Sequence, residues 1–418
     1  MGKVTVIEAR KEGRIPLVLT LIILLVVIGL LFIDFYFGQR FYQKHPPIFH
    51  FDKQEANFDL ITTGESFYTS LFKDIKNATK QVDISFFIVR NDDISKQFYE
   101  LLIMRAKEGI TVRLMLDKMG SNSLKKEIIS ELKASGVQVV FSDKPSFPYF
   151  FYRLNRRNHR KISVIDNEIA YTGGFNVGKE YLGKDPKLGP WRDYHLRATG
   201  EVVANFQVVF NYDWEAAIKG NPVSVDYVKG EASGKQEDRQ TKTLKLVVSE
   251  AGQLEDKFVS WINDAKSEIL IGTPYFIPSK EMFDALMAAL HRGVEVNVLV
   301  PAKKDHPLVK PAGFPFYRQL MQAGGKVYMF TNGFYHAKVI IIDESFCDIG
   351  TANFDMRSVF LNKEINVIMD SETDIKEIRS AYFKDVKSSQ QITVQWLNQQ
   401  PITIKIEGML ARLVRPLL

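Results

Sequence analysis

The sequence predicts an α/β protein made of two duplicated halves, each a mixed sheet flanked by helices. Three observations predict it: a histidine motif that occurs twice in register, an alternation of strands and helices around each copy, and an apolar segment near the N-terminus. A chain of 418 residues is long enough for two or three domain-sized units.

The apolar segment runs from Ile15 to Ile33 and holds no charged residue over 19 positions. As a helix it would rise ~28 Å, about the thickness of the hydrocarbon core of a bilayer. Five aromatic residues follow it, as at a membrane interface: Phe35, Tyr36, Phe37, Phe41 and Tyr42. The segment is too long for a signal peptide and no small-residue cleavage site follows. Residues 1–38 are therefore predicted to be a single-pass membrane anchor. Flanking Lys and Arg residues favour a cytoplasmic N-terminus only weakly, so the face of the catalytic part stays open.

The remaining chain divides by composition and repetition. A polar, proline-containing connector is expected at 39–56, and a Gly/Ser/charge-rich linker at 220–243. The two halves, 57–219 and 244–418, then show the same order of elements. Strand-like and helix-like segments alternate in the first half at 82–88, 97–109, 110–116 and 161–165, and in the second half at 269–277, 282–293, 294–300 and 338–342.

The repeated motif is H-x-K-x4-D, followed after six residues by G-[GT]-x-N. In the first copy His159, Lys161 and Asp166 precede Gly173 and Asn176. In the second copy His336, Lys338 and Asp343 precede Gly350 and Asn353, each 177 residues further on. A lone His near a Lys is usually incidental. Two copies in register indicate a duplicated site that takes one imidazole from each half, at the pseudo-twofold interface between the halves.

Two imidazoles suit phosphoryl transfer, because one must be neutral to attack phosphorus and the other protonated to release an alkoxide. Neighbouring imidazoles are expected to take different protonation states. On an extended strand, Lys161 and Lys338 would share a face with their histidines and neutralise the phosphate oxygens. The turn residues Asn176 and Asn353 are expected to donate hydrogen bonds to the same oxygens.

Four acidic residues complete the expected site. Asp193 and Glu364 are the candidates for carboxylates that orient the imidazoles from their far nitrogens. Asp166 and Asp343 belong to the motif and are counted with the catalytic set. Their odd spacing from the lysines turns them to the other face of a strand, so we expect them to hold the site together.

An insertion distinguishes the first half. Gly136 and His159 are 23 residues apart, whereas Gly325 and His336 are 11 apart. The twelve extra residues fall within 145–158, which carries five aromatic residues (Phe147, Tyr149, Phe150, Phe151 and Tyr152) beside Arg153, Arg156 and Arg157. Such a mixture suits a lipid interface, with guanidinium groups on phosphates, or stacking on single-stranded nucleic acid; a core loop is the plain alternative.

The C-terminal stretch 404–418 is predicted to form a basic amphipathic tail that lies on a membrane or packs on the protein. The net charge of +6 suits an anionic partner or a generally solvated basic surface. The single cysteine, Cys347, excludes internal disulfides. No phosphate-binding loop, metal-ligand spacing or nucleophile elbow is present, so no metal and no cofactor are expected. His45, His50, His291 and His306 lack the motif context and are expected to be ordinary surface residues.

The paired motifs resemble the phospholipase D superfamily. The stretches NHRKI, TGGFNV, WRDYH, TPYFIPS and GTANFDMRS resemble more closely the bacterial cardiolipin synthases, of the minor, single-anchor type found in bacilli. The likeness spans about residues 57–400. The chain departs from the usual synthase in having one apolar N-terminal segment where two are common.

This resemblance implies a transferase of the bacterial cell membrane that converts two phosphatidylglycerols into cardiolipin and glycerol. It implies phosphatidylglycerol and other anionic membrane lipids as partners, and no nucleic acid. By analogy His159 is the nucleophile and forms a phosphohistidine, and His336 is the acid and then the base. A membrane-anchored phospholipase D that uses water is the alternative, and a membrane-tethered nuclease of the same superfamily is a further one.

Overall fold

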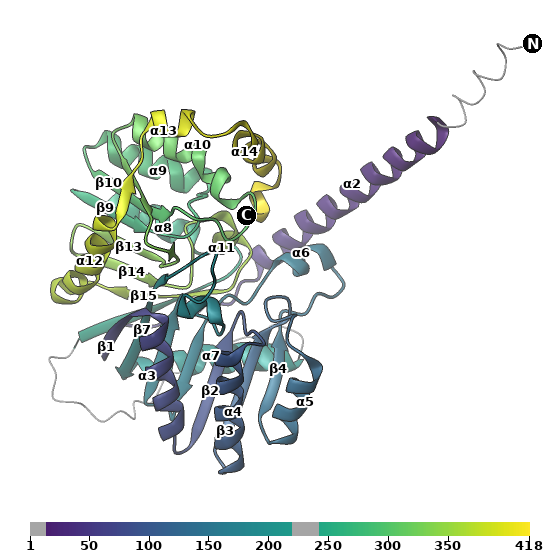
Figure 1. Cartoon of the computed structure of the whole chain (residues 1–418), viewed down its shortest axis with the longest axis vertical. Helices are drawn as coiled ribbons and strands as arrows, with labels where there is room; N and C mark the ends of the chain where they lie inside the picture. Colours follow the sequence, from purple (N-terminus) through teal and green to yellow (C-terminus); the bar gives the residue numbers. More distant parts are fainter. Residues whose placement is uncertain (1–13, 220–241) are drawn as a thin grey trace, which may run out of the picture.

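The computed structural model describes residues 14–219 and 242–418 (Figure 1). A long helix, α2 (Arg14–Lys44), projects from an α/β body. The expected connector at 39–56 is corrected at both ends, because α2 continues through Lys44 and the first strand begins at Gln54. Aromatic side chains of α2 pack on aromatic side chains of the insertion near the C-terminal end of this helix. Most of the predicted linker lies outside the described residues, and Lys242 and Thr243 already belong to a strand.

The predicted mixed sheet is confirmed, and it is continuous through both halves in the described part of the chain. Its order is β16-β11-β10-β9-β13-β14-β15-β8-β1-β7-β6-β5-β2-β3-β4, and β12 pairs with β7. The first-half strands are β1 (Gln54–Thr63), β2 (Gln81–Phe86), β3 (Thr111–Asp117), β4 (Gln138–Ser142), β5 (Ile162–Ile165), β6 (Ile169–Gly173) and β7 (Trp191–Gly200). The second-half strands are β8 (Lys242–Ser249), β9 (Glu268–Gly272), β10 (Glu295–Pro301), β11 (Lys326–Phe330), β12 (Phe334–Tyr335), β13 (Val339–Ile342), β14 (Phe346–Gly350), β15 (Glu364–Met369) and β16 (Ser389–Gln391).

The strand order shows the duplication directly. Reading outward from the antiparallel pair β1–β8, the first half runs β7, β6, β5, β2, β3, β4 and the second runs β15, β14, β13, β9, β10, β11. Each strand of the first half thus has an equivalent in the second, whereas β12 and β16 have none among the described strands of the first. In both halves the pairing is antiparallel near the centre and parallel among the three strands that end the shared order. The motif segments precede β5 and β13, which are equivalent strands, so the pseudo-twofold axis relates the two histidines.

Helices cover both faces of the sheet. Alternate residues of β3 enter different hydrophobic clusters, with Leu114 in one and Met115 in another, because successive strand side chains point to opposite faces. The first-half helices are α3 (Gly64–Asn77), α4 (Asp93–Lys107), α5 (Lys126–Ala134), α6 (Phe150–Asn155), η1 (Lys179–Leu182) and α7 (Val202–Lys219). The second-half helices are α8 (Glu255–Asp264), α9 (Lys280–His291), α10 (Val309–Gln322), α11 (Met356–Phe360), α12 (Glu372–Lys387), α13 (Val394–Asn398), α14 (Ile402–Val414) and η2 (Arg415–Leu417).

One hydrophobic cluster crosses the boundary between the halves. It joins Phe206 of α7 and Val164 of β5 to Leu246 of β8 and Ile378 of α12, and all four side chains are buried. A buried ion network also crosses the boundary between the halves, since Arg160 binds both Asp213 of the first half and Glu250 of the second. We propose that the two halves are units of duplication that fold as one sheet and one core, rather than as separate domains.

The insertion packs against the base of α2. Tyr152 is fully buried, its ring lies 5.6 Å from that of Phe35, and its backbone N–H donates to Asp34 at 3.0 Å. The expectation of lipid-facing arginines is wrong for Arg156 and Arg157. Arg156 is buried in ion pairs with Asp143 and Glu250, and Arg157 is buried beside Asp117. These carboxylates offset the cost of removing the guanidinium groups from water, so both side chains lie inside the protein.

Candidate active site

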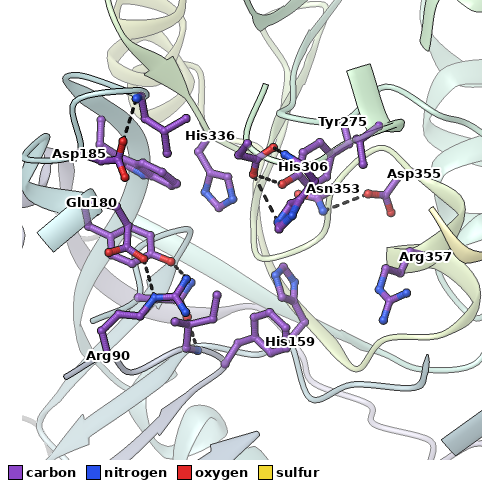
Figure 2. A pocket seen from close by; sticks show the side chains of 18 of the residues that line it. Arg90, His159, Glu180, Asp185, Tyr275, His306, His336, Asn353, Asp355 and Arg357 are labelled. Carbon is purple, nitrogen blue, oxygen red and sulfur yellow. Dashed lines mark hydrogen bonds and ion pairs between the residues drawn. The ribbon is translucent and has the colours of Figure 1, made fainter. Parts of the chain in front are cut away.

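Both motif histidines face one cavity of about 830 Å³ between the halves. Figure 2 shows the imidazoles of His159 and His336 on opposite walls of this cavity, pointing into it. The segment that carries each histidine is hydrogen-bonded to the other half: His159 N–H donates to Lys363 O at 3.0 Å, and His336 N–H donates to Arg192 O at 2.7 Å. The histidines are therefore positioned by the contact between the halves.

Each of the two candidate carboxylates contacts the histidine of the other half. Oε2 of Glu364, at the start of β15, lies 2.9 Å from Nδ1 of His159. Oδ2 of Asp193, near the start of β7, lies 2.7 Å from Nδ1 of His336. A carboxylate at Nδ1 places the ring proton there and leaves the Nε2 lone pair toward the cavity. The sequence pointed to both carboxylates but not to which histidine each one would meet.

Each carboxylate is held by further donors, and the two sets of donors differ. Trp191 Nε1 donates to Asp193 Oδ2 at 3.1 Å. Thr351 Oγ1 donates to Glu364 Oε2 at 2.6 Å. At the position equivalent to Thr351, a Cβ on Gly174 would stand 1.9 Å from Asp193 Oδ1. Gly174 thus leaves space for one carboxylate, and Thr351 hydrogen-bonds the other.

Burial favours the neutral form of both histidines. It lowers the pKa of His159 to about 4, although the Glu364 carboxylate raises it. It also lowers the pKa of His336 to about 4; Lys338 lowers this pKa further and Asp193 raises it. The two pKa values therefore do not distinguish the acid from the nucleophile, and the expectation of different protonation states stays a prediction. The surroundings of the rings differ: Lys338 Nζ lies 2.8 Å from Nδ1 and 3.0 Å from Nε2 of His336, whereas Nε2 of His159 has no hydrogen-bond partner among the described residues.

The lysines lie next to the histidines but outside the described lining of the cavity. Lys161 Nζ donates to the carbonyl oxygen of its own His159 at 2.8 Å, and Lys338 Nζ donates to the carbonyl oxygen of His336. Both side chains are buried, and burial lowers the pKa of Lys161 to about 7 and that of Lys338 to about 8. Their ammonium groups are therefore poorly solvated and titrate near neutrality.

Asn176 and Asn353 line the cavity, as expected of phosphate-binding residues. Their amide groups also bind protein: Asn176 Nδ2 donates to the Tyr181 hydroxyl at 3.1 Å and Asn353 Nδ2 donates to Asp355 at 3.0 Å. Oδ1 of Asn353 is buried without a hydrogen-bond partner among the described atoms.

The structure places Asp166 and Asp343 beyond the far ends of β5 and β13, outside the described lining of the cavity. Both have positive φ, and each accepts three backbone N–H groups from the segment before the adjacent strand. For Asp166 these donors lower the carboxyl pKa despite the opposing effect of burial. These contacts agree with a structural role for both residues, which stays a prediction.

Arg357 was not predicted as a site residue. Its guanidinium lines the cavity in Figure 2 and donates to the carbonyl oxygens of Leu417 and Asn155, at 2.9 and 2.8 Å. No carboxylate among the described residues forms an ion pair with it, and burial lowers its pKa. Arg357 lies within the stretch GTANFDMRS, three residues after Phe354, and this closeness to the second motif was the signal that could have identified it. His306, expected to be an ordinary surface residue, also lies on the cavity wall.

The fold and the paired histidine–carboxylate contacts define a phospholipase D-like protein with both copies of its motif intact. The family described as "Cardiolipin synthase, PLD-like domain" matches residues 71–214 and 258–386. The chain belongs to this family.

Curated relatives agree with this assignment. The chain is 38% identical over 380 residues to the minor cardiolipin synthase ClsB of Bacillus subtilis, covering 90% of this chain and 93% of that protein. It is 36% identical to the major cardiolipin synthase ClsA of the same organism, covering 87% of this chain and 76% of that protein. The fold is similar to that of a phosphatidylserine synthase from Haemophilus influenzae, with a TM-score of 0.69, 13% identity, and coverage of 87% of this chain and 97% of that one.

Proposed function

We propose that this protein is a membrane-anchored cardiolipin synthase that transfers a phosphatidyl group from one phosphatidylglycerol to another and releases glycerol. The observation that carries this proposal is the exchanged pair of contacts, His159 with Glu364 and His336 with Asp193, around one cavity. The identity to named cardiolipin synthases over most of the chain supports the choice of lipid. The apolar helix α2 fits a membrane anchor, with a mean hydropathy of 3.0 over its most apolar window.

In the first step Nε2 of His159 attacks the phosphorus of one lipid, and the bond from phosphorus to the glycerol oxygen breaks. The departing oxygen takes a proton from Nε2 of His336 and leaves as glycerol. The free Nε2 of His159 supports its role as nucleophile, which also follows the family pattern. Glu364 stabilises the positive charge that the phosphorylated imidazole gains, since Nδ1 keeps its proton.

In the second step the free hydroxyl of the second phosphatidylglycerol gives its proton to His336 and attacks the same phosphorus. The phosphorus–nitrogen bond breaks, cardiolipin forms, and His159 returns to its neutral state. His336 needs a proton at the first step, although its pKa in the empty site is about 4. An anionic lipid phosphate beside the ring stabilises the imidazolium and supplies the shift that is needed.

The surrounding residues take supporting roles in this proposal. Lys161 and Lys338 neutralise charge on the phosphate oxygens in the transition state, and Asn176 and Asn353 donate hydrogen bonds from the cavity wall. Arg357 binds the phosphate of the second lipid, because it is a partly buried cation on the cavity wall whose guanidinium donates, among the described residues, to carbonyl oxygens alone.

The test is lipid analysis of a cardiolipin-deficient bacterium that expresses the full chain, beside its His336→Ala variant. Cardiolipin from the unaltered protein and none from the variant would support the proposal. Phosphatidic acid without cardiolipin would make water the acceptor and the protein a phospholipase D. No change in either lipid would contradict both assignments.

A further inference from the structure

The last long helix, α14, carries an apolar face that no part of the described protein covers. The face consists of Ile402, Ile406, Met409, Leu410 and Leu413, and the Leu413 side chain is 80% exposed. Their spacing places them on one side of the helix. The opposite side packs on α10 through Ala411, which is fully buried. One side of the predicted tail therefore packs on the protein, and its apolar side is left uncovered by the described residues.

The tip of the insertion is a second exposed apolar site. Phe147 is 82% exposed and stacks on the partly exposed Phe150, with ring centroids 5.4 Å apart. The following aromatic residues of the insertion pack on α2 instead, where the ring of Phe151 lies 6.2 Å from that of Phe35. Outside α2, the exposed large hydrophobic side chains of the described residues number ten, and seven of these belong to α14 or the insertion tip.

The anchor sets the level at which a bilayer would meet the body. The span from Val18 to Ile33 is exposed and would rise ~24 Å as a helix, which is most of a hydrocarbon core. From Asp34 onward α2 is packed against the insertion. The membrane surface therefore lies near Asp34, at the level of the insertion tip. Figure 1 shows α6 and α14 both on the side of the body from which α2 departs.

We propose that the bilayer that holds α2 also covers the apolar face of α14 and the insertion tip, so that the body docks on the membrane at three places. The charges on α14 fit this occupant, because Lys405 and Arg412 are exposed beside the apolar face and would meet anionic headgroups. The proposal rests on α2 as the anchor and is independent of the reaction catalysed.

Docking at α14 would hold the catalytic cavity against the membrane. The helix leads directly into η2, and Leu417 and Leu418 line the cavity. Arg357, on the same wall, hydrogen-bonds Leu417. A lipid headgroup that leaves the bilayer beside α14 thus reaches the cavity while its acyl chains stay in an apolar surrounding, which avoids exposing them to water.

The test uses a polarity-sensitive fluorophore on single cysteines in the full chain, after Cys347→Ala removes the native, buried thiol. The probe is placed by Leu413→Cys, Phe147→Cys and, as the control, Lys133→Cys on exposed α5. Each protein is reconstituted in vesicles of phosphatidylglycerol and phosphatidylcholine, with and without nitroxide-labelled lipid. We expect a blue shift and at least twofold quenching by the nitroxide lipid at 413 and 147, and neither effect at 133.

Two results would overturn the proposal. Emission at 413 that matches the control would mean that α14 faces water, even if 147 is quenched. A blue shift at 413 without nitroxide quenching would mean that protein, such as a second copy of the chain, covers α14. Circular dichroism of each variant checks the fold, and the readout needs no catalysis, so a wrong assignment of the reaction would not change it.

Discussion

Nδ1 of His159 lies 2.9 Å from Oε2 of Glu364, and the two residues are 205 positions apart in the chain. The equivalent contact, between His336 and Asp193, spans 143 positions in the opposite sense. Each half thus supplies the histidine of one pair and the carboxylate of the other. Neither half holds a complete histidine–carboxylate pair, so chemistry requires both halves in the same sheet.

Removing the charge of either carboxylate should cost activity without loss of the fold. We expect Glu364→Gln and Asp193→Asn each to lower kcat by roughly 10³-fold or more, because the amide no longer favours the imidazole tautomer with its proton on Nδ1. Cardiolipin formation by the purified full chain in phosphatidylglycerol vesicles measures this. Glu127→Gln, on the exposed side of α5, is the matched control and should keep full activity. Full activity of Glu364→Gln would contradict the role given to that carboxylate.

The two turn positions should respond differently to substitution. A methyl group at residue 174 would overlap Asp193 Oδ1, so Gly174→Ala should displace the carboxylate from His336 and lower kcat about 100-fold. Thr351→Val removes the hydrogen bond to Glu364 and should lower kcat about tenfold, since a hydrogen bond to a charged group contributes about 1.5 kcal/mol. Thr351→Ser keeps the hydroxyl and should behave like the unaltered chain. Equal losses for the serine and valine variants would show that the hydroxyl is not what matters.

The pH dependence of kcat/KM should be bell-shaped, because this quantity reports groups of the free enzyme. Activity needs neutral His159, so it should rise with pH through about 4. It also needs protonated His336, whose pKa is likewise lowered to about 4, so it should fall gradually above pH 4. It needs charged Lys161 and Lys338 as well, so it should fall more steeply as pH increases through about 7 to 8. Lys161→Arg replaces the group of lower pKa by one that stays charged, so the alkaline limb should move toward the pKa of Lys338. An alkaline limb that does not move would rule out Lys161 as its source.

Arg357 should affect the second lipid more than the first. In Arg357→Gln the release of glycerol in the first turnover should remain, while the formation of cardiolipin should fall about 10- to 100-fold, the range expected for one charge-assisted hydrogen bond. Rapid-quench measurement of glycerol and cardiolipin separates the two steps. Arg318→Gln on α10 is the control. If glycerol release fell as much as cardiolipin formation, Arg357 would act on the first lipid.

Much of the site could be predicted because duplication is visible in sequence. His159 and His336 align over a fixed offset, and this alone implies equivalent places in two like halves. The exchange of Asp193 and Glu364 could not be predicted, because it depends on how β1 and β8 join the halves into one sheet. Asp166 lies in the turn beyond the end of β5 and outside the described lining of the cavity, so its position follows from where the strand ends and not from a reversed strand face.

Features that depend on packing between distant segments were less predictable. The burial of Arg156 and Arg157 requires the carboxylates of Asp143, Glu250 and Asp117, which come from three separate places in the chain. The pKa of both imidazoles is lowered mainly by burial, and that burial comes from the packing of the two halves around them. Arg357 enters the cavity wall from the first turn of α11, and its contacts with Asn155 and Leu417 join segments that are far apart in sequence.

The most direct test of the central claim is to find the covalent intermediate. The full chain is mixed with phosphatidylglycerol labelled with ³²P, quenched within the first turnover and digested for peptide mapping at alkaline pH, where phosphohistidine survives. We predict label on the peptide that carries His159, no label in His159→Ala, and label on the same peptide in the control Glu127→Gln. Label on the peptide that carries His336, or label that persists in His159→Ala, would contradict the account.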